Sequence, residues 1–303
     1  VPIMNGCNKF CTYCIVPHVR GREISRPVEA IVKEVTDLGV KGFKEITLLG
    51  QNVNSYGLDF KDGTDFGTLV DALDGIPGIE RIRYMTSHPQ DMSKSMIDAL
   101  GRSSNIVTHL HLPIQSGSNR ILKKMNRHYT VEHYKELLSY CREKIKDVVV
   151  TTDIIVGFPG ETAEEFQETY DFIVKHKFSE LHVFPYSQRI GTPAARMDDQ
   201  IDESIKNERV HKLIALSDQL AKEYASKFEN EVLEVIPEEV GETKDTLVGY
   251  ADNYMKVEFE GSEDLIGEIV KVKINKADYP INIGSAVRIV NHATNKTEEG
   301  VLL

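Results

Sequence analysis

The feature that most constrains this sequence is a group of three cysteines close to its start. Cys7, Cys11 and Cys14 stand at C-x3-C-x2-C spacing in the stretch GCNKFCTYC. Thiols at this spacing can converge on one side of a tight loop, and three thiolates leave one iron of a cubane cluster without a protein ligand. A site closed by four thiolates has no such open position. The spacing therefore favours a 4Fe–4S cluster that can bind a further ligand.

Two alternatives remain open at this point, a zinc site and three unrelated buried thiols. Zinc knuckles usually show C-x2-C pairs followed by a second pair of Cys or His. No such pair follows here, because the fourth cysteine, Cys141, lies far along the chain on an expected helix. Scattered histidines, among them His109 and His111 on one face of an expected strand, show no metal-binding spacing.

Composition limits the class of protein and its partners. The chain of 303 residues has no run of eighteen apolar residues and no secretion signal, so we expect a cytoplasmic protein that does not enter a membrane. Its net charge of −11 argues against loose, nonspecific binding to nucleic acid. If RNA is the partner, Arg20, Arg22 and Arg26, which follow the cysteines, are the predicted positive patch for the substrate.

The hydrophobic pattern predicts six strands that alternate with helices over residues 1–228. Such alternation predicts parallel strands with helical crossovers, and six units are fewer than the eight of a closed barrel. We therefore expect an α/β fold with a partial (βα)6 TIM-like barrel. The expected strands are residues 1–4, 45–49, 81–87, 109–115, 148–158 and 181–187, and the expected helices include 27–41, 66–75, 92–101, 119–125, 130–146, 163–175 and 202–228.

The pattern changes after residue 228, which we take as a domain boundary. Five short β-rich runs follow in residues 229–303, namely VLEVIPEEV, TLVGYADN, YMKVEFEG, GEIVKVKINKA and SAVRIVNH. Runs of this length and spacing predict a small antiparallel, OB-like barrel. This second domain carries sixteen acidic residues against seven basic ones, so whether it contacts RNA is left open.

At this point the sequence resembles a known family, the radical S-adenosylmethionine (SAM) enzymes, and within it the tRNA methylthiotransferases of the MiaB type. The cysteine motif carries an aromatic residue, Tyr13, just before its last cysteine, as in the family. The C-terminal runs resemble the TRAM domain. The motifs that carry the resemblance stand in the expected order: GCNKFCTYCIVPHVRGREISRP, LLGQNVNSYG, TSHPQD, HLHLPIQSGSNRILKKMNR, TTDIIVGFPGET and YSQRIGTPAA.

The resemblance implies a set of cofactor contacts at the ends of the expected strands, with a 4Fe–4S cluster on the three cysteines and SAM bound to its open iron. Gly50 and Gln51 would lie near the amino group of SAM. Gln115 and Ser116 would meet its ribose or carboxylate, although Ser116 or Ser118 can equally cap the next helix. The remaining implied contacts with SAM or its adenine are Tyr13, Asp153, Ile155, Gly157, Glu161 and Tyr186.

One of these positions departs from the family motif, and another has a second interpretation. Asp153 stands where the family motif has a glycine, and Glu161 at a helix start is also favourable beside the helix dipole without any ligand. Arg189 follows the last strand and is expected to meet a phosphate of the substrate. Aromatic stacking and arginine contacts are common ways to hold an extruded base.

The implied reaction places a methylthio group on carbon 2 of isopentenyl-adenosine, next to the anticodon of tRNA. The family carries a second cluster on an N-terminal domain with three more cysteines, which this sequence does not contain. We therefore expect a fragment or shortened relative that binds one cluster and cleaves SAM but does not complete sulfur insertion. An electron donor such as flavodoxin is implied, and the oligomeric state is not readable.

Other functions remain to be distinguished. Within the same family, the substrate could be threonylcarbamoyl-adenosine in tRNA or an aspartate of a ribosomal protein. The loop NVNSYG after Gln51 favours the tRNA branch. A different class is an RNA-binding module with a structural metal. Release of deoxyadenosine from SAM would separate the enzyme from the module.

Overall fold

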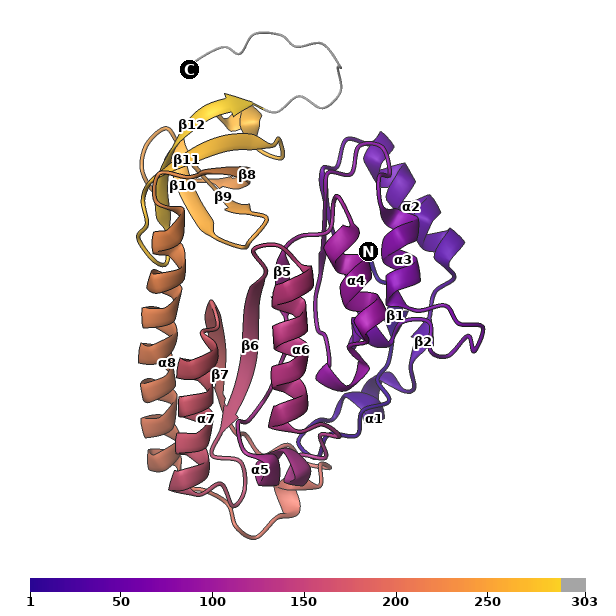
Figure 1. The fold of residues 1–303 in the computed structure, drawn as a ribbon, viewed down its shortest axis with the longest axis vertical. Coiled ribbons are helices and arrows are strands. Elements are labelled where there is room, and N and C mark those ends of the chain that lie inside the picture. The colour runs from indigo at the N-terminus through magenta and orange to yellow at the C-terminus, as the bar shows by residue number, and fades with distance from the viewer. Residues whose placement is uncertain (290–303) are drawn as a thin grey trace.

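Parallel strands and helices alternate through the first domain, which confirms the predicted partial barrel (Figure 1). The computed structural model describes residues 1–289. The pairs β3–β4 and β5–β6–β7 are parallel, and the bridges Pro2–Leu49 and Ile82–Ile106 join them into one open series from β1 to β7. Its strands are β1 Met4–Asn5, β3 Glu45–Leu48, β4 Arg81–Tyr84, β5 His109–His111, β6 Val149–Val156 and β7 Glu180–Pro185, and a short β2 Ile24–Ser25 pairs antiparallel with β1.

Helices follow the strands and cover one face of this sheet, near the positions that the 3.6-residue period predicts. Thr130 caps one of them by accepting a hydrogen bond from the His133 amide. None of the helices in the described part of the chain is both long and apolar enough to cross a membrane. The helices are α1 Val16–Arg20, α2 Val28–Val40, α3 Phe66–Leu73, α4 Lys94–Arg102, α5 Asn119–Lys124, α6 Val131–Lys144, α7 Ala163–His176 and α8 Glu203–Ala225.

The alternation of side chains along β6 shows how the two faces of the sheet differ. Val150 and Ile154 point into the main hydrophobic core, between the sheet and the helices. Thr151, Asp153 and Ile155 alternate with them and therefore belong to the opposite, inner face. The inner face is thus largely polar, and it is this face that the candidate site uses.

Several expected strands are shorter than their sequence patterns suggest: the strand expected at 1–4 is observed only at Met4–Asn5, the one expected at 81–87 ends at Tyr84, and the one expected at 109–115 is the clearest case. The alternation at 109–115 predicts seven residues, but β5 ends at His111. Pro113 has no amide hydrogen for a strand ladder, and Gln115 adopts a left-handed backbone with φ of 73°. Only an isolated bridge from Gln115 to Ile154 continues the pairing.

The second domain is a closed five-stranded barrel, as predicted, but one pairing differs from the expectation. The strands close in the order β10–β12–β11–β8–β9. The predicted antiparallel pairing is confirmed for the other neighbouring strands, but β10 and β12 pair in parallel. The last predicted run ends outside the described residues. The strands are β8 Val232–Val240, β9 Thr246–Ala251, β10 Lys256–Glu260, β11 Val270–Lys276 and β12 Asn282–Ile289.

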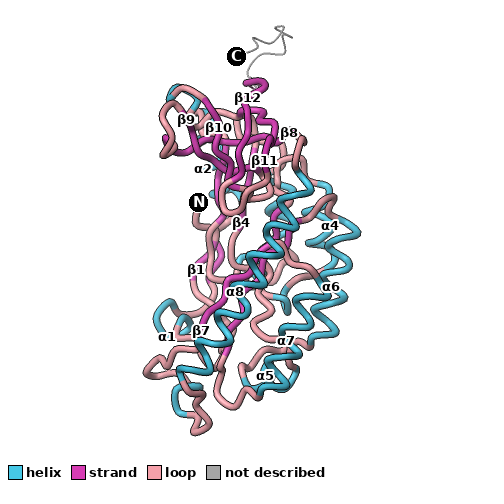
Figure 2. Tube along the Cα trace, turned by 90° about the vertical axis from the view of Figure 1, so that its left-hand side faces the viewer, coloured by secondary structure: helices cyan, strands magenta, loops and turns pink. Residues whose placement is uncertain are grey.

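The small barrel lies at the end of the molecule opposite the cysteine loop, with α8 running along the first domain up to it (Figure 2). Two buried arginines of β4 hold it there. Arg81 donates to the carbonyls of Glu234 and Tyr250, and Arg83 donates to those of Ala251 and Asp252.

The same two guanidinium groups form ion pairs with Glu45 at 3.1 and 2.8 Å. Arg83 also lies over the ring of Tyr254, 4.2 Å from its centroid. Buried charges in the first domain are therefore satisfied in part by backbone carbonyls of the second.

We expect Arg83→Met to lower the free energy of unfolding by about 3 kcal/mol, because it leaves buried polar groups without partners. Thermal unfolding and hydrogen exchange of the β9 amides would measure the loss. Lys33→Met is the matched control, since its ion pair with Asp37 is exposed to solvent and contributes little to stability. Equal effects of the two changes would contradict the role given to Arg83.

Candidate functional site

The three cysteines lie on a loop between β1 and α1 whose path is fixed by its neighbours. The loop begins at Gly6, which has φ of 84° and whose added Cβ would stand 2.0 Å from the Arg22 carbonyl oxygen. Any side chain there is excluded. The Gly6 amide donates to Gln51 Oε1 at 2.7 Å, so Gln51 anchors the loop.

Further along, the loop is attached to two other parts of the domain. The Thr12 amide donates to the Met125 carbonyl at 3.0 Å, and its hydroxyl donates to the Lys124 carbonyl at 2.9 Å. The Thr12 carbonyl accepts from the Ala194 amide at 2.9 Å. The cysteine loop is therefore held from the segments that follow β3, β5 and β7.

The thiols suit an iron–sulfur cluster in their type and surroundings. Cys7, Cys11 and Cys14 are all free, and the first two are buried. Burial raises the pKa of Cys7 to about 11 and also raises that of Cys14. These thiols are therefore protonated until a cation displaces their protons. The Lys9 amide donates to Cys7 Sγ at 3.4 Å, a contact that favours the thiolate.

A buried arginine next to Cys11 was not expected from the sequence. Arg127 Nη1 donates to Cys11 Sγ at 3.6 Å, and Nη2 donates to the Pro113 carbonyl at 3.0 Å. Its Nε donates to the Tyr129 hydroxyl. Among the described residues no carboxylate forms an ion pair with this guanidinium, although its side chain is almost fully buried. A buried cation without an anion beside a cluster cysteine fits an anionic iron–sulfur cluster.

A cavity of about 370 Å³ opens beside the cysteine loop, at the carboxyl ends of β6 and β7. We call it the strand-end cavity. Active sites of βα barrels lie at this end of the strands. Seven of the residues predicted to bind cofactor or substrate line it: Tyr13, Cys14, Gln115, Asp153, Ile155, Tyr186 and Arg189.

Two polar atoms at this cavity have no partner within the described chain. The side-chain carbonyl of Gln115 and the hydroxyl of Tyr186 are buried without a hydrogen bond. Gln115 also holds its strained left-handed backbone here. Strain and unsatisfied polar atoms at one place are typical of ligand sites. Both atoms suit the hydroxyl and amino groups of SAM.

Tyr13, Ile155 and Tyr186 form an aromatic and apolar wall of the cavity. Phe158 lies behind this wall, in the same small cluster of packed side chains. The rings of Phe158 and Tyr186 meet edge to face with centroids 5.4 Å apart. Such a wall can take the flat face of an adenine.

The other predicted cofactor residues do not line the cavity and have contacts of their own. Gly50 lies against Met4 at the end of β3. The Ser116 hydroxyl accepts from the Ser118 amide, while Ser118 caps α5.

Gly157 and Glu161 act together in the loop after β6. Glu161 is buried, accepts from the Gly157 amide at 2.7 Å and pairs with Arg209 of α8. Burial nevertheless raises its pKa. These contacts give Glu161 a part in shaping the loop that carries Phe158.

The predicted arginines are placed differently from one another. Arg20 is exposed at the end of α1, and Arg22 lies over the ring of Phe10. Arg26 forms an ion pair with Glu34 at 2.7 Å. Of the predicted arginines, only Arg189 lines the strand-end cavity. Substrate binding by all four stays a prediction.

Comparison with known proteins places these features in a family. The model of the Radical SAM superfamily matches residues 1–173, and the model of the TRAM domain matches residues 226–279. Two solved structures share the fold at 18% identity. They are coproporphyrinogen III oxidase of Escherichia coli, with a TM-score of 0.55 over 72% of this chain and 52% of that one, and the radical S-adenosylmethionine methyltransferase TsrM of Kitasatospora setae, with 0.54 over 64% and 38%.

Curated relatives are more similar in sequence. The threonylcarbamoyladenosine tRNA methylthiotransferase MtaB of Bacillus subtilis is 56% identical, over 95% of this chain and 64% of the relative. The tRNA-2-methylthio-N(6)-dimethylallyladenosine synthase of Acetivibrio thermocellus is 50% identical, over 95% of this chain and 60% of the relative. The chain thus spans less than two thirds of the length of these relatives.

We expect Arg127→Met to lower the midpoint potential of the reconstituted cluster by on the order of 60 mV, equivalent to tenfold in a one-electron equilibrium. Loss of a buried positive charge disfavours the more negative, reduced cluster. A redox titration followed by electron paramagnetic resonance would measure it. Arg142→Met is the control, because Arg142 donates to the carbonyls of His176 and Lys177, away from the cysteines. An unchanged potential in Arg127→Met would refute the electrostatic role.

Proposed function

This chain belongs to the radical SAM superfamily, and from that premise we propose that it is the catalytic part of a tRNA methylthiotransferase. Membership of the superfamily implies a 4Fe–4S cluster and SAM, which agrees with the expectation from the sequence. The observation that carries the proposal is the strand-end cavity, where a cluster cysteine, strained Gln115 and unsatisfied Tyr186 meet. The names of the two curated relatives support tRNA methylthiolation as the reaction.

The chain's own residues would bind and orient the cofactors. Cys7, Cys11 and Cys14 would hold the cluster, which together with SAM supplies reductive cleavage of a carbon–sulfur bond. Gln115 and Tyr186 would accept hydrogen bonds from SAM at atoms that lack partners in the protein. The aromatic wall would exclude water from the same space.

The proposed target is carbon 2 of an N6-modified adenosine beside the anticodon. The sequence pointed to the isopentenyl (dimethylallyl) group, and one relative is named for it. A second candidate, the threonylcarbamoyl group, is favoured by the higher identity to the Bacillus subtilis relative. It carries a carboxylate, for which Arg189 at the cavity is a suitable partner.

The TRAM domain and the named relatives favour tRNA over a ribosomal protein as the partner. An RNA-binding module with a structural metal is the alternative from another class, and it predicts no reaction with SAM.

We expect anaerobic reconstitution to load roughly four irons per chain, and the loaded chain to release 5′-deoxyadenosine from SAM in the presence of dithionite. Cys11→Ala should lose the product to background, because an essential ligand is gone. Cys141→Ala is the control, since Cys141 is buried on α6 and belongs to the main core. Product from Cys11→Ala equal to that from Cys141→Ala would mean that the cysteine group was misinterpreted, and no product from the unchanged chain would reject the enzyme and leave the binding module.

We expect Arg189→Gln to weaken binding of an anticodon stem–loop that carries threonylcarbamoyl-adenosine by about tenfold, the effect of losing one charge-assisted hydrogen bond. Binding of the isopentenyl stem–loop should change little. Fluorescence anisotropy of the loaded chain with SAM would measure both. Arg196→Gln, at an exposed arginine of the same segment, is the control. An equal loss with both stem–loops would mean that Arg189 meets a phosphate instead.

A further inference from the structure

Three side chains from neighbouring strands meet on the inner face of the sheet, and only one of them, Asp153, was expected from the sequence to contact a cofactor. We propose that His111 of β5, Asp153 of β6 and His182 of β7 bind a divalent transition-metal ion of the zinc type. Each of the three side chains offers one ligand atom, and these three atoms all lie within 4.8 Å of one another. Among the described residues, these three side chains form a group that could hold a metal ion.

The register of the strands produces this convergence. Asp153 lies directly opposite His182 in the β6–β7 pair, and His111 lies opposite Thr151, one inner-face position before Asp153. His111 Nε2 is 3.3 Å from Asp153 Oδ1, and His182 Nδ1 is 3.1 Å from the same oxygen. Two ligands of one tetrahedral zinc ion lie about 3.4 Å apart, given bonds of about 2.0–2.1 Å. The distances from Asp153 Oδ1 to the two histidine nitrogens therefore already match the ligand spacing of a zinc site.

A neighbouring hydroxyl orients one of the ligands. Thr151 Oγ1 is 2.9 Å from His111 Nδ1 and 2.9 Å from His109 Nε2. Histidine ligands usually use one ring nitrogen for the metal while the other is hydrogen-bonded, which fixes the ring. His111 is buried and held in this way, whereas His182 is half exposed and can adjust.

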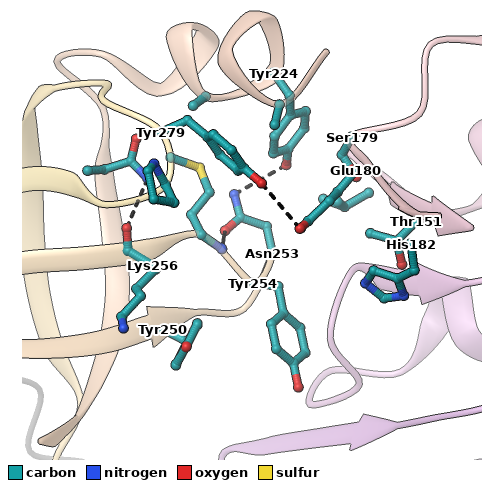
Figure 3. Close-up of a pocket in the computed structure, with 16 residues that line it drawn as sticks. Thr151, Ser179, Glu180, His182, Tyr224, Tyr250, Asn253, Tyr254, Lys256 and Tyr279 are labelled. Atoms are coloured by element: carbon teal, nitrogen blue, oxygen red, sulfur yellow. Dashed lines mark hydrogen bonds between the residues drawn. The ribbon is translucent and has the colours of Figure 1, made fainter. Parts of the chain in front are cut away.

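The position of the group gives an ion there access to ligands. Asp153 also lines the strand-end cavity. His182 and Thr151 line a second cavity of about 340 Å³, between the sheet and the small barrel (Figure 3). Three protein ligands leave at least one coordination position free, as in catalytic zinc sites. An ion at this place would face open space and could take an oxygen or nitrogen atom of a substrate.

The competing explanation is that the three side chains only hydrogen-bond one another. Asp153 Oδ1 can accept a hydrogen from each histidine, and Thr151 can complete the chain toward His109. In that case the group is a polar network that needs no ion. Direct measurement of bound metal separates the two explanations.

The test uses the full chain with its cluster already loaded, so that the three cysteines are not free to take up zinc. After incubation with a slight excess of Zn²⁺ and exhaustive dialysis, we expect one zinc per chain by elemental analysis. His182→Ala and Asp153→Asn should lose the bound zinc. His211→Ala, at an exposed histidine of α8, is the matched control and should retain it.

Thr151→Val keeps the shape of its side chain and leaves all three ligands in place, so it tests the site without removing it. Loss of the hydrogen bond to His111 should weaken zinc binding by about tenfold, the lower end of the effect of such supporting residues. Co²⁺ in place of Zn²⁺ should give the intense visible bands of a tetrahedral site in the unchanged chain and none in His182→Ala. No zinc in the unchanged chain, or equal zinc in His182→Ala, would overturn the proposal.

Discussion

The attachment of the cysteine loop at three points is the constraint on which the site depends. The sheet is open, and among the described strands β7 pairs only with β6. Thr12 bonds to Met125 and to Ala194, while Gly6 bonds to Gln51. The loop therefore reaches from the β3 side of the opening to the segment after β7. A shift of any of these segments would move the thiols relative to the strand-end cavity.

Burial of polar and charged side chains on the inner face of the sheet costs free energy, and these side chains find hydrogen-bond partners in both domains. The interior of a closed βα barrel is usually filled by layers of branched apolar side chains. Here the inner face carries Arg83, His109, Thr151, Asp153 and similar groups. Buried groups of this kind need partners. Those nearest the small barrel find them in its backbone carbonyls, so the second domain completes the first.

Sequence reasoning succeeded where the signal is local. Strand and helix periods gave the six βα units, and the cysteine spacing identified the loop, because both depend on residues close together in the chain. It failed where partners are distant. Arg127 meets Cys11 from 116 positions away, with no local pattern to mark it. His182 joins Asp153 only through the register of two strands.

The sequence pattern also did not predict backbone conformation or the orientation of paired strands. Alternation at 109–115 gives no sign that Gln115 turns into a left-handed conformation, since a ligand-facing residue can carry strain that periodicity does not record. In the same way, short β-rich runs reveal that strands exist but not which of them pair, and so the parallel closure of β10 on β12 was missed. The motifs predicted which residues belong to the site, and only the fold shows how those residues lie relative to one another.

The cysteine loop and the strand-end cavity beside it make two opposite demands on a ligand, and together these demands limit what can bind there. Arg127 is a buried cation without a carboxylate partner in the described chain, on the side of Cys11. Gln115 and Tyr186 offer lone pairs that no donor uses. A ligand set must therefore bring negative charge to the loop and hydrogen-bond donors to the wall. An anionic cluster with three thiolates and a SAM molecule with hydroxyl and amino groups bring both. A single zinc ion on the three thiolates would also be anionic overall, so the charge of Arg127 does not separate zinc from the cluster. The wall does separate them, because zinc alone would leave Gln115 and Tyr186 without partners, whereas a cluster that binds SAM would satisfy both.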